Sequence, residues 1–129
     1  MQTIDEYFKE IQDIIAKSKI VASTDIEYVK VLDREGYMRG TLTFIDGSEL
    51  RLLEYTSISH RQPTVLRYRF QWQTAEEFIV RWNNAPHHPE VGTFPYHKHV
   101  KGEGSPKPSR ATNLISVLKE IEAEIVSKS

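Results

Sequence analysis

Large apolar and polar residues alternate over most of residues 37–83, and this alternation limits the fold more than any other feature of the sequence. In residues 65–73 the even positions are Leu66, Tyr68, Phe70 and Trp72, and the odd positions are Val65, Arg67, Arg69, Gln71 and Gln73. Successive side chains of a strand point to opposite faces, so this segment predicts a strand with one apolar face. The same pattern recurs in residues 37–45, 48–56 and 77–83. Asp46-Gly47 lies between the first two of these segments and is typical of a tight hairpin.

Helical periodicity marks the two ends of the chain. Apolar residues recur at helical spacing over residues 4–18, directly after a capping-box pattern formed by Thr3 and Glu6. A second amphipathic helix is predicted over about residues 112–127, with Ser109 or Thr112 as its N-cap. We expect both helices to cover the sheet face that bears Leu42, Phe44, Leu50, Tyr68, Phe70, Trp72, Phe78 and Trp82.

The remaining segments complete the predicted architecture. Residues 20–33 predict a first strand, and Gly36 is expected to supply the turn after it. We predict a connecting loop over residues 57–63 and an irregular segment over residues 84–107. The fold class is therefore α+β, a single domain over residues 1–129: an antiparallel sheet of about five strands with an N-terminal and a C-terminal helix packed mainly on one face.

Composition narrows the cellular setting. The chain has no cysteine, which excludes disulfides and thiolate chemistry and favours a reducing, cytoplasmic location. No stretch is apolar enough to span a bilayer, so no membrane partner is expected. The formal net charge is −1, and a nucleic-acid site would therefore depend on local segregation of basic residues. A homodimer is compatible with the sequence.

Basic residues are concentrated on the polar face of the predicted sheet. If the strand registers align, this face carries Arg39, Arg51, Arg67, Arg69 and Arg81. The planar guanidinium binds phosphate with two donors and stacks on bases, so such a face is suited to RNA. The alternative is that these arginines are solvated and pair across strands with Glu49, Glu54 or Glu77. Because polar outer faces are the norm for antiparallel sheets, the pattern alone favours this second interpretation.

Histidines cluster in NAPHHPEVGTFPYHKHV, which contains His87, His88, His97 and His99. Histidine titrates near neutral pH, so these residues are candidates for acid–base catalysis, with Lys98 holding a phosphate beside them. They could instead buttress a loop by hydrogen bonding. A metal site in which His97 and His99 are joined by His87, His88 or Glu90 is a third hypothesis, but the spacing matches no standard zinc pattern. His60 we assign to structure or solvent.

The stretch RYRFQWQTAEEFIVRWNNAPHHPEVGTFPYHKHV, at residues 67–100, resembles the core of the TumE-like family of type II toxin–antitoxin toxins. That family shows an aromatic-arginine strand followed by the segments R-[YW]-[DN]-N-A-P-H-H-P and P-x-H-K-H-V. The hairpin FIDGSELRLLEY and the last helix are also similar to the family. One departure is Asn83, which stands where an aspartate is commoner, and the linker GEGSPKPSRAT is longer and more basic than usual.

The resemblance implies a toxin encoded near a cognate antitoxin, which we expect to be a helix-turn-helix protein. By analogy with other small toxins, the expected target is RNA or the translation machinery. The leading hypothesis is a metal-independent ribonuclease that needs no cofactor, with His87, His88, His97 and His99 in acid–base roles. Phosphate would be bound by Arg67, Arg69, Arg81 and Lys98, with Arg51 and Arg39 beside them. The alternative is a non-catalytic module that binds nucleic acid or protein through the same surface.

Overall fold

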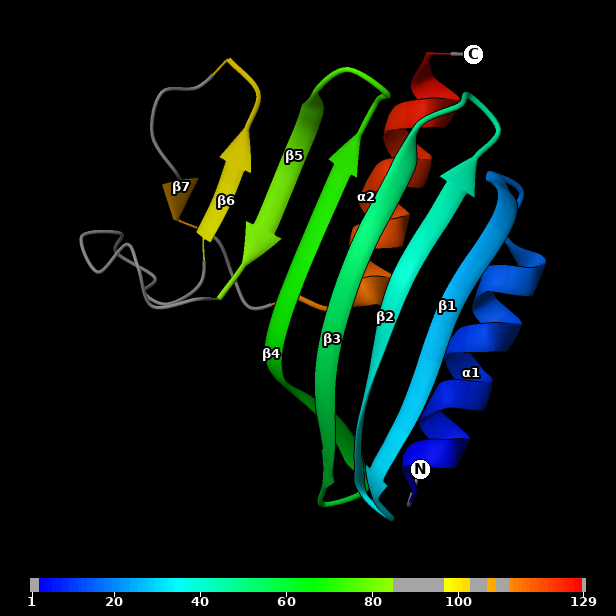
Figure 1. Ribbon diagram of the computed structural model, residues 1–129, viewed down its shortest axis with the longest axis vertical. Coiled ribbons are helices and arrows are strands. Elements are labelled where there is room, and N and C mark those ends of the chain that lie inside the picture. The colour runs from blue at the N-terminus through cyan, green and yellow to red at the C-terminus, as the bar shows by residue number, and fades with distance from the viewer. Residues whose placement is uncertain (1–2, 85–96, 103–106, 109–111, 129) are drawn as a thin grey trace.

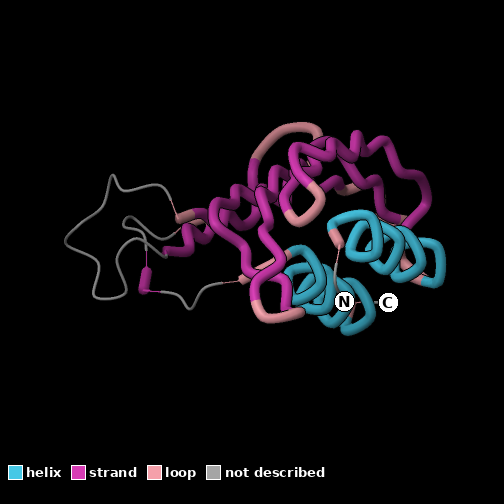
Figure 2. Tube along the Cα trace, turned by 90° about the horizontal axis from the view of Figure 1, so that it is seen from below, coloured by secondary structure: helices cyan, strands magenta, loops and turns pink. Residues whose placement is uncertain are grey.

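The alternating segments pair into one antiparallel sheet whose strands follow the order of the chain, β1 to β7. The computed structural model describes residues 3–84, 97–102, 107–108 and 112–128. Its elements are α1 (Ile4–Lys17), β1 (Val21–Leu32), β2 (Glu35–Phe44), β3 (Glu49–Ser59), β4 (Gln62–Gln73), β5 (Phe78–Asn83), β6 (His97–Val100), β7 (Lys107–Pro108) and α2 (Leu114–Ser127). The two helices lie side by side on one face of the sheet (Figures 1 and 2). The predicted α+β class and the helix placement are confirmed, and Thr3 is the N-cap of α1 as expected.

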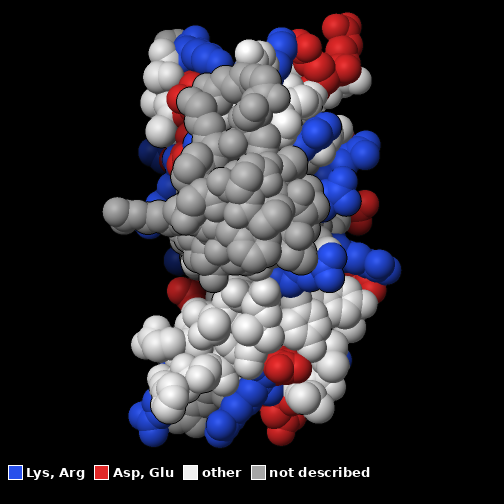
Figure 3. All heavy atoms as spheres, turned by 90° about the vertical axis from the view of Figure 1, so that its left-hand side faces the viewer, with Lys and Arg blue, Asp and Glu red and all other residues white. Residues whose placement is uncertain are grey.

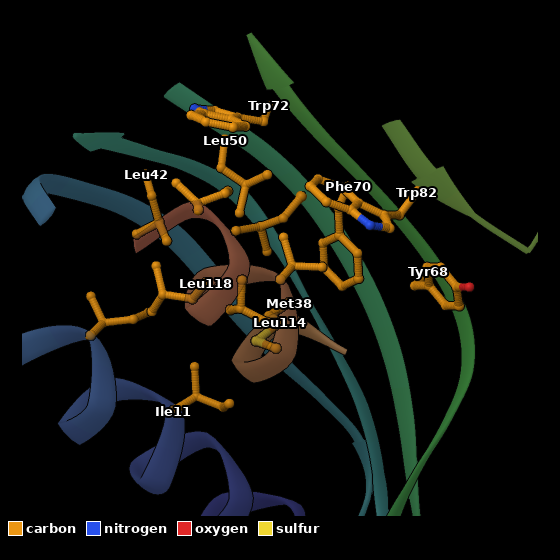
Figure 4. Packing of buried hydrophobic residues seen from close by; sticks show 14 of the residues in the cluster. Ile11, Met38, Leu42, Leu50, Tyr68, Phe70, Trp72, Trp82, Leu114 and Leu118 are labelled. Carbon is orange, nitrogen blue, oxygen red and sulfur yellow. The ribbon is translucent and has the colours of Figure 1, made fainter. Parts of the chain in front are cut away.

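The core lies between the helices and the apolar face of the sheet. Tyr68, Phe70 and Trp72 are only 2, 0 and 4% exposed, as the alternation in β4 predicts. Ile11 of α1 and Leu118 of α2 meet this face from the helix side (Figure 4). Burial of such large apolar side chains is the main favourable contribution to folding. Neither described helix has the length and apolar character needed to cross a lipid bilayer.

A buried carboxylate joins three elements of the fold. Glu54, on the helix-facing side of β3, is fully buried. Its Oε2 accepts hydrogen bonds from the Tyr7 hydroxyl at 2.5 Å and the Thr56 hydroxyl at 2.8 Å, and its Oε1 accepts one from the Leu114 backbone N–H at 2.9 Å. Burial raises the pKa of the Glu54 carboxyl, because desolvation penalises its charged form more than these three donors favour it. Glu54 thus links α1, β3 and the N-terminus of α2.

Three predicted boundaries are wrong. The expected loop over residues 57–63 is a tight hairpin, because β3 and β4 continue until only His60 and Arg61 remain between them. The segment expected to be irregular contributes β6, which pairs with β5, and the two-residue β7. The N-cap of α2 is Asn113 rather than Ser109 or Thr112, since its side chain accepts the Ser116 N–H at 2.8 Å.

Gly36 is paired within β2 and does not form the turn after β1, which consists of residues 33–34. A Cβ added to Gly36 would lie 2.5 Å from the Val29 carbonyl oxygen and 2.9 Å from the Phe8 ring. Both distances are shorter than real Cβ contacts, so the glycine allows α1 to approach the sheet closely.

Two β-bulges change the predicted faces locally. In β5 the register shifts between Trp72 and Gln73, so that Ile79 has no partner and Phe78 pairs with Gln73 of the polar face. Phe78 therefore leaves the helix-facing side, contrary to the prediction. In β4 a second shift leaves Leu66 without a register partner in β3, and Leu66 is 52% exposed.

Candidate functional site

The polar face of the sheet carries two cross-strand rows that run from β2 to β6. One row pairs, in order, Thr41, Arg51, Gln71, Arg81 and His99, and the next pairs Arg39, Leu53, Arg69, Asn83 and His97. Arg67 lies two residues before Arg69 in β4, beside Tyr55. We call the five arginines together the arginine face: Arg39, Arg51, Arg67, Arg69 and Arg81. Basic side chains gather along the right-hand side of the view from the β7 edge, the side away from the helices (Figure 3).

Carboxylates neutralise the arginine face only in part. Arg39 pairs with Glu27 at 3.6 Å and Arg51 pairs with Glu49 at 3.4 Å, both at exposed positions where ion pairs contribute little. Of the other predicted partners, Glu54 is buried on the opposite face and Glu77 pairs with Lys101.

The three remaining arginines have no carboxylate partner in the part of the chain that the structure describes. Among the residues that the structure describes, no carboxylate lies within ion-pair distance of Arg67, Arg69 or Arg81. All three side chains are exposed. The solvated interpretation therefore fits Arg39 and Arg51, whereas these three guanidinium groups have free donors for an external anion.

A hollow of about 490 Å³ opens between the two rows. Arg51, Arg69 and Gln71 supply its polar lining, and Leu53 adds a half-buried apolar surface. Guanidinium and amide donors beside an apolar patch suit a nucleotide, whose phosphate is charged and whose base has a flat apolar face.

A cluster of side chains orients the Arg81–His99 end of the first row. The guanidinium of Arg81 lies over the Phe78 ring, 4.0 Å from its centroid, and its Nε donates to Gln71 Oε1 at 3.0 Å. The His99 ring meets the same Phe78 edge-on, with ring centroids 5.6 Å apart. Phe78 thus holds Arg81 and His99 on adjacent strands while the terminal nitrogens of Arg81 remain available. The sequence pattern missed Phe78 because the bulge at Ile79 cannot be read from alternation.

Lys98 does not lie with the arginines. It pairs with Trp82 on the helix-facing side of the sheet, where its Nζ is 3.1 Å from Glu120 of α2 and 5.4 Å from the centroid of the Trp82 ring. The physical reason is that side chains alternate along β6. His97 and His99 occupy positions of the polar face, so Lys98 between them points to the helix-facing side.

The other candidate histidines are placed only in part. His97 holds the register position opposite Asn83, two residues before His99. His87 and His88 lie outside the described residues, as does Glu90. In the described part of the chain, no three His, Asp or Glu side chains come together as a metal site. The histidine roles therefore stay predictions.

Asn84, next to the histidine segment, fixes the start of that segment to the sheet. Its Oδ1 accepts the Tyr68 N–H at 2.9 Å, and its Nδ2 donates to the Leu66 carbonyl at 3.0 Å. These bonds satisfy backbone groups of β4 at the bulge. Sequence reasoning did not single out Asn84, although an amide beside a strand end is a common signal for such a bridge.

Comparison with known proteins adds one finding to this geometry. No curated protein and no solved structure matches the chain. The family model described as Toxin TumE matches residues 11–128, a range that includes the sheet, the arginine face and the positions of His87, His88, His97 and His99. The chain therefore belongs to the TumE toxin family.

Proposed function

We propose that this protein is the toxin of a type II toxin–antitoxin pair and that it acts on RNA as a metal-independent ribonuclease. The observation that carries the proposal is the pair of cross-strand rows: Arg81 pairs directly with His99, and Asn83 joins Arg69 to the register position of His97. The family supports the toxin role and implies a cognate antitoxin, which we expect to be a helix-turn-helix protein encoded nearby.

The proposed chemistry needs a base, an acid and a cation around one phosphodiester. One histidine takes the proton of the 2′-hydroxyl, whose oxygen attacks the phosphorus, and a second protonates the leaving 5′-oxygen. Arg81 and Arg69 stabilise the charge that develops on the phosphoryl oxygens. His97 and His99 are the proposed acid and base, and His87 and His88 complete the proposed set. Lys98 is left out, because its position beside Glu120 is on the opposite face.

A second candidate function is a non-catalytic module that grips nucleic acid or a protein through the arginine face. Asn83 favours it, because the amide that lies between Arg69 and His97 in the second row cannot act as a general acid or base. Cleavage and binding measurements on the same variants distinguish the two functions.

Production of the protein alone in a bacterial host should slow growth, and co-production of the neighbouring antitoxin should restore it. The physical basis is that the protein alone can bind its target through the arginine face, and that the antitoxin prevents this binding. The measurement is growth rate after induction, with soluble protein verified in both cultures. Normal growth at confirmed soluble expression would remove the toxin proposal.

Converting Arg67 and Arg69 to alanine should weaken RNA binding and flatten its dependence on salt. Each lost phosphate contact reduces the slope of log K against log salt by about 0.7 for a single strand, so the expected change is about 1.4. Titrations of labelled RNA at several salt concentrations measure it. The charge-matched control is Lys9→Ala with Lys17→Ala, two exposed positions on α1 in the other layer. Equal slopes for the two double variants would show that the arginine face is merely solvated.

A further inference from the structure

The β3–β4 turn has a backbone that its residues do not favour. His60 and Arg61 both have positive φ, 52° and 63°. A two-residue hairpin turn of type I′ needs positive φ at both central positions, and Asn-Gly is a dipeptide that adopts this geometry easily. Other residues pay a conformational cost there, and such cost is concentrated at functional sites. In the β2–β3 turn, by contrast, the positive φ falls on a glycine, Gly47 at 87°.

The side chains at this turn form a basic group with Arg34 of the β1–β2 turn. Arg34, His60 and Arg61 line a hollow of about 450 Å³ together with Ile58 and Ser59. The Arg34 carbonyl accepts the Ile58 N–H at 2.7 Å, which fixes the two turns side by side. Within the described residues no carboxylate forms an ion pair with Arg34, His60 or Arg61. Arg34 and Arg61 therefore give the hollow two positive charges that no described carboxylate pairs with.

A polar strip connects this hollow to the arginine face. Between Arg67 and the turn, the cross-strand pairs that share the polar face are Ser57 with Thr64 and Ser59 with Gln62. Hydroxyl and amide groups can donate to phosphate oxygens and carry no repelling charge. On this hairpin face the carboxylate of Glu49 lies at the far end, already paired with Arg51, and Glu35 of the adjacent β2 accepts the Tyr55 hydroxyl at 2.9 Å.

Together with the arginine face, the polar strip is long enough to bind a single strand of RNA. From Arg51 to Ser59 the chain covers eight residue steps of β3, a contour of about 27 Å at 3.3–3.4 Å per step. Midway lie Tyr37 and Tyr55, half-buried rings stacked with centroids 6.3 Å apart and planes within 17°. Aromatic rings beside a basic groove are the elements that single-stranded nucleic acid uses, since unpaired bases stack on them.

We propose that the His60–Arg61 turn, with Arg34, is a distal phosphate-binding subsite for single-stranded RNA. The RNA would run from the His97 and His99 positions of β6 along the β3–β4 hairpin to this turn. The proposal rests on the RNA target proposed above and adds a substrate class and a second contact region to it. The turn keeps unfavourable residues because Arg61 supplies a positive charge and His60 a ring donor, both of which Asn-Gly would lack.

The test exchanges the turn for the dipeptide that its backbone favours, in the double variant His60→Asn, Arg61→Gly. This variant should be more stable, with Tm higher by a few degrees, because the strain is relieved. Its affinity for a labelled single-stranded RNA of about 12 nucleotides should fall about tenfold, whereas affinity for one of about four nucleotides should not change. Stability and affinity thus move in opposite directions, which loss of folding cannot produce.

Two further variants complete the design. Arg34→Ala leaves the turn residues in place and should weaken binding of the longer RNA in the same way. The control pair Lys9→Ala, Lys17→Ala removes two positive charges from the other layer, more than either of these variants, and should bind both RNAs as wild type. A stabilised turn variant that binds the longer RNA as wild type would overturn the subsite while leaving the RNA target intact, provided that Arg67→Ala, Arg69→Ala still weakens binding.

The remaining outcomes are also decisive. Tighter binding to duplex than to single-stranded RNA would overturn the substrate class alone. No binding of wild type to either RNA would overturn the subsite and the proposed RNA target together, and a protein target for the arginine face would replace them.

Discussion

Conversion of His97 and His99 to alanine should lower the rate of RNA cleavage by about 10²–10⁴-fold, the usual contribution of acid–base groups to a chemical step. The fold and most of the RNA affinity should persist, because the arginine face supplies the ground-state contacts and His99 is only half-buried on β6. Single-turnover cleavage and equilibrium binding of the same RNA measure the two effects separately. A double variant that cleaves and binds as wild type would make the binding-module function the correct one.

Two comparisons sharpen this experiment. Lys98→Ala changes the residue between the two histidines, but Lys98 lies on the helix-facing side and pairs with Glu120. A cleavage rate close to wild type is expected from that position, and a loss as large as that of the histidine variant would contradict it.

Chelators should leave cleavage and stability unchanged under the proposed mechanism. If EDTA stops cleavage and zinc or manganese restores it, a metal site in the histidine segment is the better explanation.

Conversion of Glu54 to alanine should lower the free energy of unfolding by about 3–5 kcal/mol. The change removes the acceptor of three buried donors, the Tyr7 hydroxyl, the Thr56 hydroxyl and the Leu114 N–H, and leaves a cavity under β3. Glu54→Gln keeps the shape and one carbonyl oxygen, and the hydroxyls can turn to accept from its amide, so its cost should be much smaller. Urea unfolding of both variants gives the comparison. An alanine variant as stable as the glutamine variant would mean that Glu54 does not join the three elements.

The pH dependence of stability provides an independent check on Glu54. Because burial raises the pKa of this carboxyl, the native state holds its proton more tightly than the unfolded chain does. The resulting stabilisation is complete below the ordinary carboxyl pKa of about 4.3 and is lost as pH rises through the higher native value. The stability of wild type relative to Glu54→Gln should therefore decline with rising pH in this window. An increase would mean that the N-terminus of α2 favours the charge more than burial opposes it.

Much of the fold could be predicted because alternation and helical spacing both report which side of an element is buried. The apolar positions of β4 and the arginines of the opposite face follow from period two alone. Applied to residues 97–99, the same rule puts Lys98 on the face opposite His97 and His99, but the sequence predicts an irregular segment there rather than a strand.

Other features have no local signal. The bulges at Leu66 and Ile79 depend on how β4 and β5 fit their neighbours, so the displacement of Phe78 towards Arg81 and His99 could not be predicted. Glu54 reads as one more polar residue of a strand until α1 and α2 bring their donors to it. His60 and Arg61 do not resemble hairpin residues, which is why a loop was expected where the turn occurs.

The order of the sheet, in which every strand neighbours the next one along the chain, has a consequence for folding kinetics. Hairpins that close over short loops form early, and proteins rich in such near-sequence contacts fold fast. The hydrogen bond from Leu114 to Glu54 spans 60 residues and can form only after the whole sheet is synthesised. We therefore expect β1–β5 to assemble during translation and α2 to dock last, so that the chain becomes fully stable only when its C-terminal helix has left the ribosome.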